Sequence, residues 1–184
     1  MSALPTISTD RMTAEERLAA LYDAHAERLH AVARRLLRSP ADAEECVQEV
    51  FVQLALRLGR GKIDDPAAYL FSSLRNGALA RLRETAKRDA LGLRLVTSDE
   101  DARDPIPRDP LQSRALAAAI EALPLEQREV LALKIDGDLT FAQIAECLGI
   151  SLNTAASRYR YALEKLKAAL LPRGSGPGFD EEAP

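Results

Sequence analysis

Six side chains suited to hydrogen bonding with nucleic acid lie close together towards the carboxyl end of the chain. They are Asn153, Thr154, Ser157, Arg158, Arg160 and Tyr161. Amide and hydroxyl groups can hydrogen-bond to the edges of bases, and guanidinium groups bind backbone phosphates. The sequence carries no Gly-rich phosphate loop, and His25 and His30 have no carboxylate or nucleophile at a telling spacing. The chemistry indicated is therefore binding, and we predict neither an enzyme nor a cofactor.

Two short helices joined by a tight turn are predicted to position these side chains. Thr140 can cap the first helix, and Gln143 stands at the capping-box spacing from it. Gly149 follows the last apolar residue of that helix, where a left-handed backbone favours glycine. Ser151 can cap the second helix. This pattern is typical of a helix-turn-helix, with a plain helical hairpin as the simpler alternative.

The composition of the 184 residues favours an all-α protein. Aromatic residues make up 4% of the chain, Trp is absent, and β-branched residues never alternate over a strand-length window. The formal net charge is −3, which argues against tight binding of nucleic acid by charge alone. DNA binding is then either local to small patches or assisted by a partner.

The two cysteines, Cys46 and Cys147, lie far apart in the chain and outside any CxxC or Cys/His cluster. We therefore expect no metal site, and two thiols in a reducing compartment. No apolar run approaches membrane-spanning length, and the amino terminus lacks a signal-peptide core. A cytoplasmic protein without membrane insertion is expected.

Three further helices are predicted upstream, over about 13–38, 40–58 and from 66 onward. Ser39 and Asp65 stand as caps, each followed by a proline at the first helical position. The stretch from 97 to 110 is acidic, rich in proline and nearly free of apolar residues, which is typical of a linker. The predicted fold is two small helical domains joined by a flexible linker, with a flexible segment at each end. The boundaries are 1–12, 13–94, 95–112, 113–171 and 172–184.

Two sequence blocks in this order carry a family resemblance. The first comprises DAEECVQEVFVQLALRL (42–58) and PAAYLFSSLRNGALARLRE (66–84), and the second is LPLEQREVLALKIDGDLTFAQIAECLGISLNTAASRYRYALEKL (123–166). The chain resembles a bacterial sigma factor of the extracytoplasmic-function group of the sigma-70 family. This implies a dissociable subunit that directs RNA polymerase to promoters. Region 2 (13–94) would bind the polymerase clamp and the −10 element, and region 4 (113–171) the −35 element. Binding to the polymerase flap and to an anti-sigma factor is also implied.

The resemblance implies three sets of site residues. The polymerase-docking set is Asp42, Glu45, Gln48 and Glu49. The −10 set is Arg60, Lys62, Tyr69, Arg75, Asn76, Arg81, Arg83, Lys87 and Arg88. The −35 set is the group of six named above.

The sequence departs from the family pattern at four positions. Tyr69 stands where the family commonly has Trp, and Ala80 where it has Asp. Ala156 and Tyr161 stand where basic residues are common, and neither can make bidentate contacts with guanine. An altered −35 sequence is the hypothesis that follows.

Two other functions fit parts of the chain. A helix-turn-helix regulator would bind DNA without polymerase, although its upstream domain is usually α/β rather than helical. A sigma-like decoy would bind a regulatory partner but start no transcription. The acidic tail FDEEAP could also fold back on a basic patch, although an exposed ionic contact of that kind contributes little.

Overall fold

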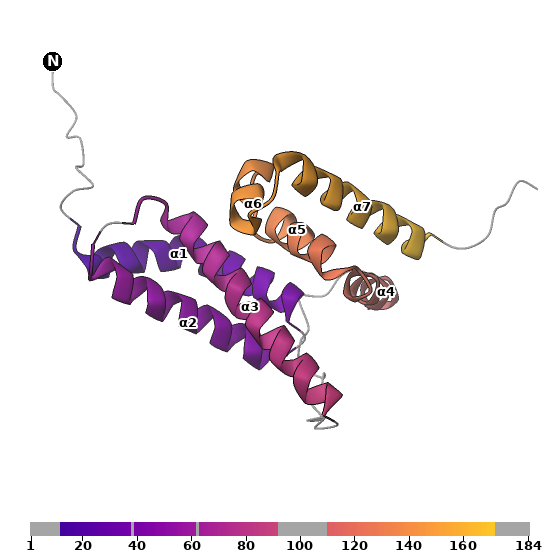
Figure 1. Ribbon diagram of the computed structural model, residues 1–184, viewed down its shortest axis with the longest axis horizontal. Helices are drawn as coiled ribbons and strands as arrows, with labels where there is room; N and C mark the ends of the chain where they lie inside the picture. Colours follow the sequence, from indigo (N-terminus) through magenta and orange to yellow (C-terminus); the bar gives the residue numbers. More distant parts are fainter. Residues whose placement is uncertain (1–11, 38, 62, 92–109, 172–184) are drawn as a thin grey trace, which may run out of the picture.

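The computed structural model describes residues 12–37, 39–61, 63–91 and 110–171, which form seven helices and no strand (Figure 1). The predicted all-α fold is confirmed. Lys62, the predicted linker up to residue 109 and the predicted flexible ends 1–11 and 172–184 lie outside the described residues.

The first unit is a bundle of three helices. α1 (Ala14–Leu36) and α2 (Pro40–Leu58) lie side by side, and α3 (Pro66–Ala90) crosses both (Figure 1). Ser39 and Asp65 cap α2 and α3 as predicted, each accepting a hydrogen bond from a backbone N–H group three residues on. Each cap satisfies a donor that the helix itself cannot pair.

One apolar face of each helix points into the shared core of this unit. The residues that α2 contributes recur at helical spacing: Ala43, Cys46, Val47, Val50, Phe51, Leu54 and Leu58. Phe71 and Leu74 of α3 are completely buried among them. Burial of this apolar surface is the main force that holds the three helices together.

The second unit contains α4 (Pro110–Glu121), α5 (Leu125–Ile135), α6 (Phe141–Leu148) and α7 (Leu152–Leu170). α4 begins within the stretch that was predicted as linker up to residue 112. A proline is tolerated in the first turn of a helix, so Pro110 starts α4 rather than excluding it.

The predicted helix-turn-helix is formed by α6 and α7. The Thr140 N–H donates to Gln143 Oε1 at 2.9 Å, and the Gln143 N–H donates back to Thr140 Oγ1 at 3.3 Å, which completes the capping box. Gly149 adopts the left-handed conformation with φ of 65°. Ser151 caps α7 by accepting from the Thr154 N–H at 3.1 Å. The local sequence signals of this motif are thus all confirmed.

The two units pack directly against each other. α1 contacts α5, and α3 contacts α6. A continuous cluster of buried apolar side chains runs from Leu29 and Leu74 in the first unit to Val130 and Ile144 in the second. Within the described part of the chain, no helix has both the length and the apolar character needed to cross a bilayer.

Candidate nucleic-acid interface

The amino-terminal half of α7 presents the six polar and basic residues predicted from sequence. Ala155 is fully buried, so the opposite side of the helix faces outward. Asn153 is exposed, and Ser157 and Arg158 are half-buried. The Thr154 hydroxyl lies 2.8 Å from Ser151 Oγ, which ties it to the cap of the helix. The start of α7 can therefore approach base edges, as a recognition helix does.

Arg160 and Tyr161 continue this surface. The Arg160 guanidinium carbon lies 5.2 Å from the centre of the Tyr161 ring, and Tyr161 is 48% exposed. Arg160 also pairs with Glu164 at 3.9 Å, but both side chains are largely exposed. Exposed pairs of this kind contribute little and are readily exchanged for a phosphate.

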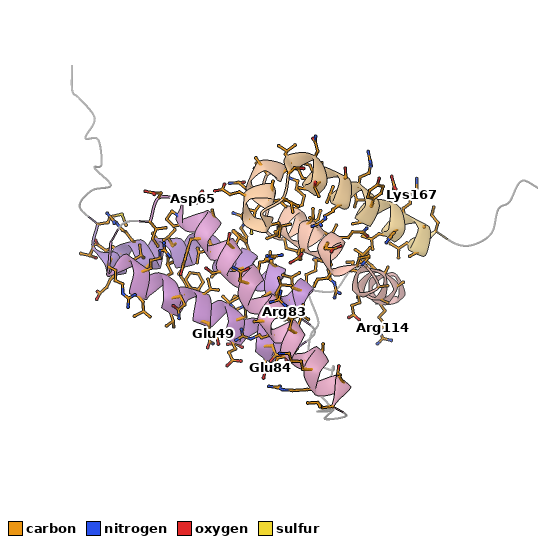
Figure 2. All side chains as sticks on the ribbon, in the orientation of Figure 1. Glu49, Asp65, Arg83, Glu84, Arg114 and Lys167 are labelled. Carbon is orange, nitrogen blue, oxygen red and sulfur yellow. The ribbon has the colours of Figure 1, made fainter. Side chains whose placement is uncertain are left out.

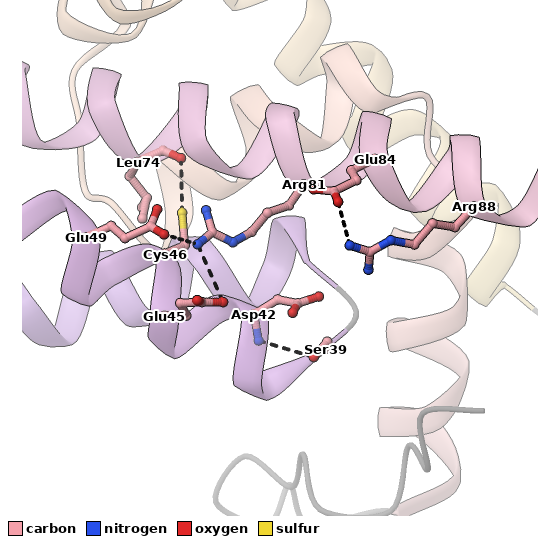
Figure 3. Close-up of polar contacts among 9 residues, drawn as sticks. All are labelled: Ser39, Asp42, Glu45, Cys46, Glu49, Leu74, Arg81, Glu84 and Arg88. Atoms are coloured by element: carbon pink, nitrogen blue, oxygen red, sulfur yellow. Dashed lines mark hydrogen bonds and ion pairs between the residues drawn. The ribbon is translucent and has the colours of Figure 1, made fainter. Parts of the chain in front are cut away.

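The outer side of α2 carries the predicted acidic set. Glu45, Gln48 and Glu49 are exposed, and Asp42 is half-buried near the start of the helix. Arg81 of α3 reaches this face, with Nη2 2.8 Å from Glu49 Oε1 and 3.7 Å from Glu45 Oε2 (Figure 3). These carboxylates are thus held in position by the neighbouring helix.

The same side of α2 carries an apolar extension that the sequence analysis missed. Val52 is 57% exposed and Leu56 is 53% exposed. They follow Glu45 and Glu49 at helical spacing, so the four residues form one stripe. The spacing from Glu45 and Glu49 could have placed Val52 and Leu56 on the exposed face. In the sequence, however, apolar residues on a helix are first expected in the core.

The predicted −10 residues occupy two environments. Arg60, Asn76, Arg83, Lys87 and Arg88 are exposed, as seen for Arg83 on the downstream half of α3 (Figure 2). Arg88 pairs with Glu84 one turn earlier. Exposed basic and amide side chains of this kind can reach a nucleic-acid strand.

Tyr69, Arg75 and Arg81 are engaged within the protein. The Tyr69 ring lies under the Arg57 guanidinium, 5.0 Å from ring centre to carbon. Arg75 Nε donates to Glu129 Oε1 of the second unit at 2.7 Å. Glu129 is only 3% exposed and was not singled out from sequence, because nothing in its local pattern indicates a partner 54 positions upstream.

Cys46 is buried and Cys147 is half-buried. Burial raises the pKa of the Cys46 thiol, which lies 3.7 Å from the Leu74 carbonyl oxygen (Figure 3). Burial also raises the pKa of Cys147, while a hydrogen bond with Ser72 and the charge of Arg75 act in the opposite direction. Thiols with raised pKa are poor nucleophiles. Among the described residues, no group of three or more His, Cys, Asp or Glu could hold a metal ion.

Comparison with known proteins shows the family to which the chain belongs. The family described as Sigma-70 region 2 matches residues 21–88, and the family described as Sigma-70, region 4 matches residues 113–166. The ECF RNA polymerase sigma factor SigL of Mycobacterium tuberculosis (strain ATCC 25618 / H37Rv) is 32% identical over 158 residues, which cover 84% of this chain and 89% of SigL. The chain is an extracytoplasmic-function sigma factor of the sigma-70 family.

Two other relatives extend over nearly the whole sigma factor. The ECF RNA polymerase sigma factor SigK of Mycobacterium sp. (strain KMS) is 28% identical over 181 residues, covering 91% of this chain and 94% of SigK. The RNA polymerase sigma factor CarQ of Myxococcus xanthus is 29% identical over 161 residues, covering 85% of this chain and 91% of CarQ. The protein therefore directs promoter-specific transcription initiation by RNA polymerase and belongs to a family that is not enzymatic. α1–α3 are its region 2, and α4–α7 its region 4.

Two solved structures have the same fold as this sigma factor. The sigma factor RpoE, in complex with the anti-sigma factor NepR from Bartonella quintana, superposes with a TM-score of 0.67 at 23% identity, covering 85% of this chain and 95% of RpoE. CnrH, in complex with the cytosolic domain of CnrY, gives 0.60 at 23% identity, covering 85% of this chain and 88% of CnrH. At this identity the likeness establishes the fold of both regions.

Proposed function

We propose that this sigma factor docks on core RNA polymerase through the outer stripe of α2. The stripe combines the predicted acidic set, Asp42, Glu45, Gln48 and Glu49, with the apolar side chains of Val52 and Leu56. Carboxylates at helical spacing make charge-assisted hydrogen bonds to arginines on a partner, and the apolar end adds buried area. The exposed acidic and apolar side chains on one helix face are the observation that supports this role.

A charge reversal tests the docking surface. Glu45→Lys places a positive charge in the stripe, and the affinity for core polymerase should fall about tenfold because like charges then face each other. Glu27→Lys, on an exposed position of α1, is the matched control and should bind core polymerase normally. Equal losses in both variants would show that α2 is not the contact surface.

The promoter contacts are proposed from exposure and chemistry. Asn76 can donate to and accept from an unstacked base of the −10 element, and the exposed Arg60, Arg83, Lys87 and Arg88 can neutralise phosphates. Asn153, Ser157 and Tyr161 lie nearest to where base edges of the −35 element would be, while Arg158 and Arg160 serve phosphates. Lys62 belongs to the −10 set by its position in the sequence.

Run-off transcription with purified core polymerase on a randomised promoter library tests this assignment. We expect transcripts whose promoters share two elements, with a −35 sequence that departs from the common motif of the family. Recovery of that common motif would contradict the altered specificity. Absence of any specific transcript would favour the decoy, which binds a partner without initiating transcription.

We also propose that an anti-sigma factor binds this protein in the cytoplasm, where RNA polymerase acts. RpoE forms a complex with the anti-sigma factor NepR, and CnrH forms one with the cytosolic domain of CnrY. Here the exposed Val52 and Leu56 offer apolar area that such a partner can cover.

A further inference from the structure

Arg57, in the last turn of α2, lies over the ring of Tyr69 in the first turns of α3. Its guanidinium carbon is 5.0 Å from the centre of the ring. A cation within about 6 Å of a ring centre is attracted to the face of the ring. Arg57 belongs to none of the three site sets predicted from the sequence, because its aromatic partner lies on the next helix.

The charge of Arg57 has no acidic partner in the part of the chain that the structure describes. Arg57 is exposed, and the carboxyl end of a helix favours a positive charge. Its backbone carbonyl accepts a hydrogen bond from the Arg60 N–H at 3.1 Å, which brings a second exposed arginine to the same turn. Among the described residues, neither arginine forms an ion pair with a carboxylate. This end of α2 therefore attracts anions.

The contact changes what the Tyr69 ring can bind. Tyr69 is half-buried and packs against the buried apolar cluster of the protein. The Arg57 guanidinium lies over the ring, so it competes with any base for the ring face. A guanidinium is itself planar, and it can stack on an aromatic ring and on a nucleobase. An incoming base can therefore meet Arg57 before it meets Tyr69.

The pair lies in line with Asn76. Tyr69 and Asn76 are seven positions apart on α3, which places them on the same side of the helix, about 10 Å apart along its axis. That separation corresponds to about three nucleotides of a stacked strand at ~3.4 Å each. A strand that presents one base to Asn76 can thus bring another base to the Arg57–Tyr69 pair.

We propose that Arg57, held by Tyr69, is a further DNA-binding residue that stacks on an unpaired base of the −10 element. The ring orients the guanidinium, and the outer face of the guanidinium receives the base. Every base has a π-face, so this stack holds the opened strand without selecting the base. The inference rests on the proposed −10 contacts of region 2, and it adds a stacking residue to them.

A phosphate contact is the alternative for an exposed arginine, and two substitutions distinguish it from a stack. Arg57→Lys keeps the positive charge but removes the planar group. An abasic nucleotide keeps the phosphate but removes the base. A stack needs both the planar group and the base, whereas a phosphate contact needs neither.

The test measures the affinity of reconstituted holoenzyme for a premelted promoter recovered from the run-off library. Each −10 nucleotide of either strand is replaced in turn by an abasic analogue. In the wild type, one abasic position other than that of the Asn76 base should weaken binding about tenfold. Arg57→Lys should bind the intact promoter about tenfold more weakly, and the same abasic position should then have little further effect.

Arg114→Lys, at an exposed position of α4, is the matched control and should reproduce the wild type at every abasic position. Wild-type affinity in Arg57→Lys would overturn the stack, and so would additive losses from Arg57→Lys and every abasic position. Both results leave the proposed function intact, because wild-type run-off transcription from the same promoter reports on it separately. Absence of a specific wild-type transcript would contradict the proposed function and this inference together.

Substitution of the ring tests whether Tyr69 holds the guanidinium. Tyr69→Phe keeps the ring and should retain the coupling between Arg57 and the base. Tyr69→Leu removes the ring and should reduce that coupling, because the guanidinium is then no longer oriented. Urea unfolding of the full chain first establishes that both variants fold, and the Arg57 series decides the proposal if Tyr69→Leu does not. Full coupling in a folded Tyr69→Leu variant would contradict the proposed arrangement.

Discussion

Arg81 Nη2 of α3 lies 2.8 Å from Glu49 Oε1 of α2, so one helix of region 2 orients the acidic face of another (Figure 3). The hydrogen bond to Glu49 is the main reason that the pKa of Arg81 is raised. Arg81 is 17% exposed, whereas Glu49 is 56% exposed. The arginine is thus half-buried beneath a carboxylate that still reaches solvent.

Arg81 and Arg83 stand two positions apart on α3 and should differ in phenotype. Arg81→Ala should lower the free energy of unfolding by about 1 kcal/mol, because it removes a charge-assisted hydrogen bond, and should weaken core binding. Arg83→Ala should leave stability within about 0.5 kcal/mol and reduce the salt slope of holoenzyme binding to promoter DNA by about 1. Chemical denaturation and salt titrations measure both. The same reduction of the slope in Arg81→Ala would show that Arg81 binds phosphate after all.

Gly137 tolerates no side chain. A Cβ atom there would lie 2.6 Å from the Leu133 carbonyl oxygen, which is backbone and cannot move away. Gly137→Ala should therefore lower the free energy of unfolding by about 1–3 kcal/mol. Gly59→Ala is the control, because its Cβ would meet only ordinary contacts at 3.6 Å or more. Urea unfolding measures the free energy of unfolding of both variants. Equal values for Gly137→Ala and Gly59→Ala would contradict the steric argument.

His25 should make the stability of region 2 dependent on pH. Burial lowers its pKa, with a further contribution from Arg28, while Asp65 acts against them; its Nδ1 atom is buried without a hydrogen-bond partner. The unfolded chain then binds the proton more tightly, so stability falls as pH drops below about 6.5. Melting temperatures at pH 7.5 and 5.5 should show a smaller drop for His25→Gln than for wild type. An identical drop would exclude His25 as the source.

Substitutions at two positions of α7 should affect promoter specificity and promoter affinity separately. Asn153→Ala should change which base is preferred at one −35 position, since an exposed amide can hydrogen-bond to a base edge. Arg160→Ala should weaken binding to all promoters alike and reduce the salt slope by about 1. A promoter-library selection with each variant distinguishes them. A uniform loss in Asn153→Ala would place that side chain on the backbone instead.

Much of region 4 could be predicted from sequence because its signals are local. The Thr140–Gln143 capping box, the left-handed Gly149 and the Ser151 cap each depend on residues within one or two turns. The start of α4 could not be predicted in the same way. Pro110 is compatible with both a linker and a first helical turn, and only contacts with α7 favour the helix.

The local pattern does not show which of the predicted site residues pair within the protein. Exposure and chemistry agree for residues such as Asn76 and Asn153, whose side chains face solvent. Arg75 and Arg81 look like the neighbouring basic residues in sequence, but they pair with Glu129 and Glu49. A basic residue on a helix has the same local pattern whether a phosphate or a distant carboxylate neutralises it.

The sequence by itself determined the helices, their caps, the helix-turn-helix and the membership of the sigma-70 family. These depend on helical spacing and on motifs within a few residues of each other. Only the tertiary structure decided which charged side chains pair with a distant residue of the protein. The partner of Arg75 lies 54 positions away and Asp136, the partner of Arg35, lies 101 positions away, and no local pattern encodes such a pairing. Their contacts arise from the packing of two regions whose apolar faces share one core.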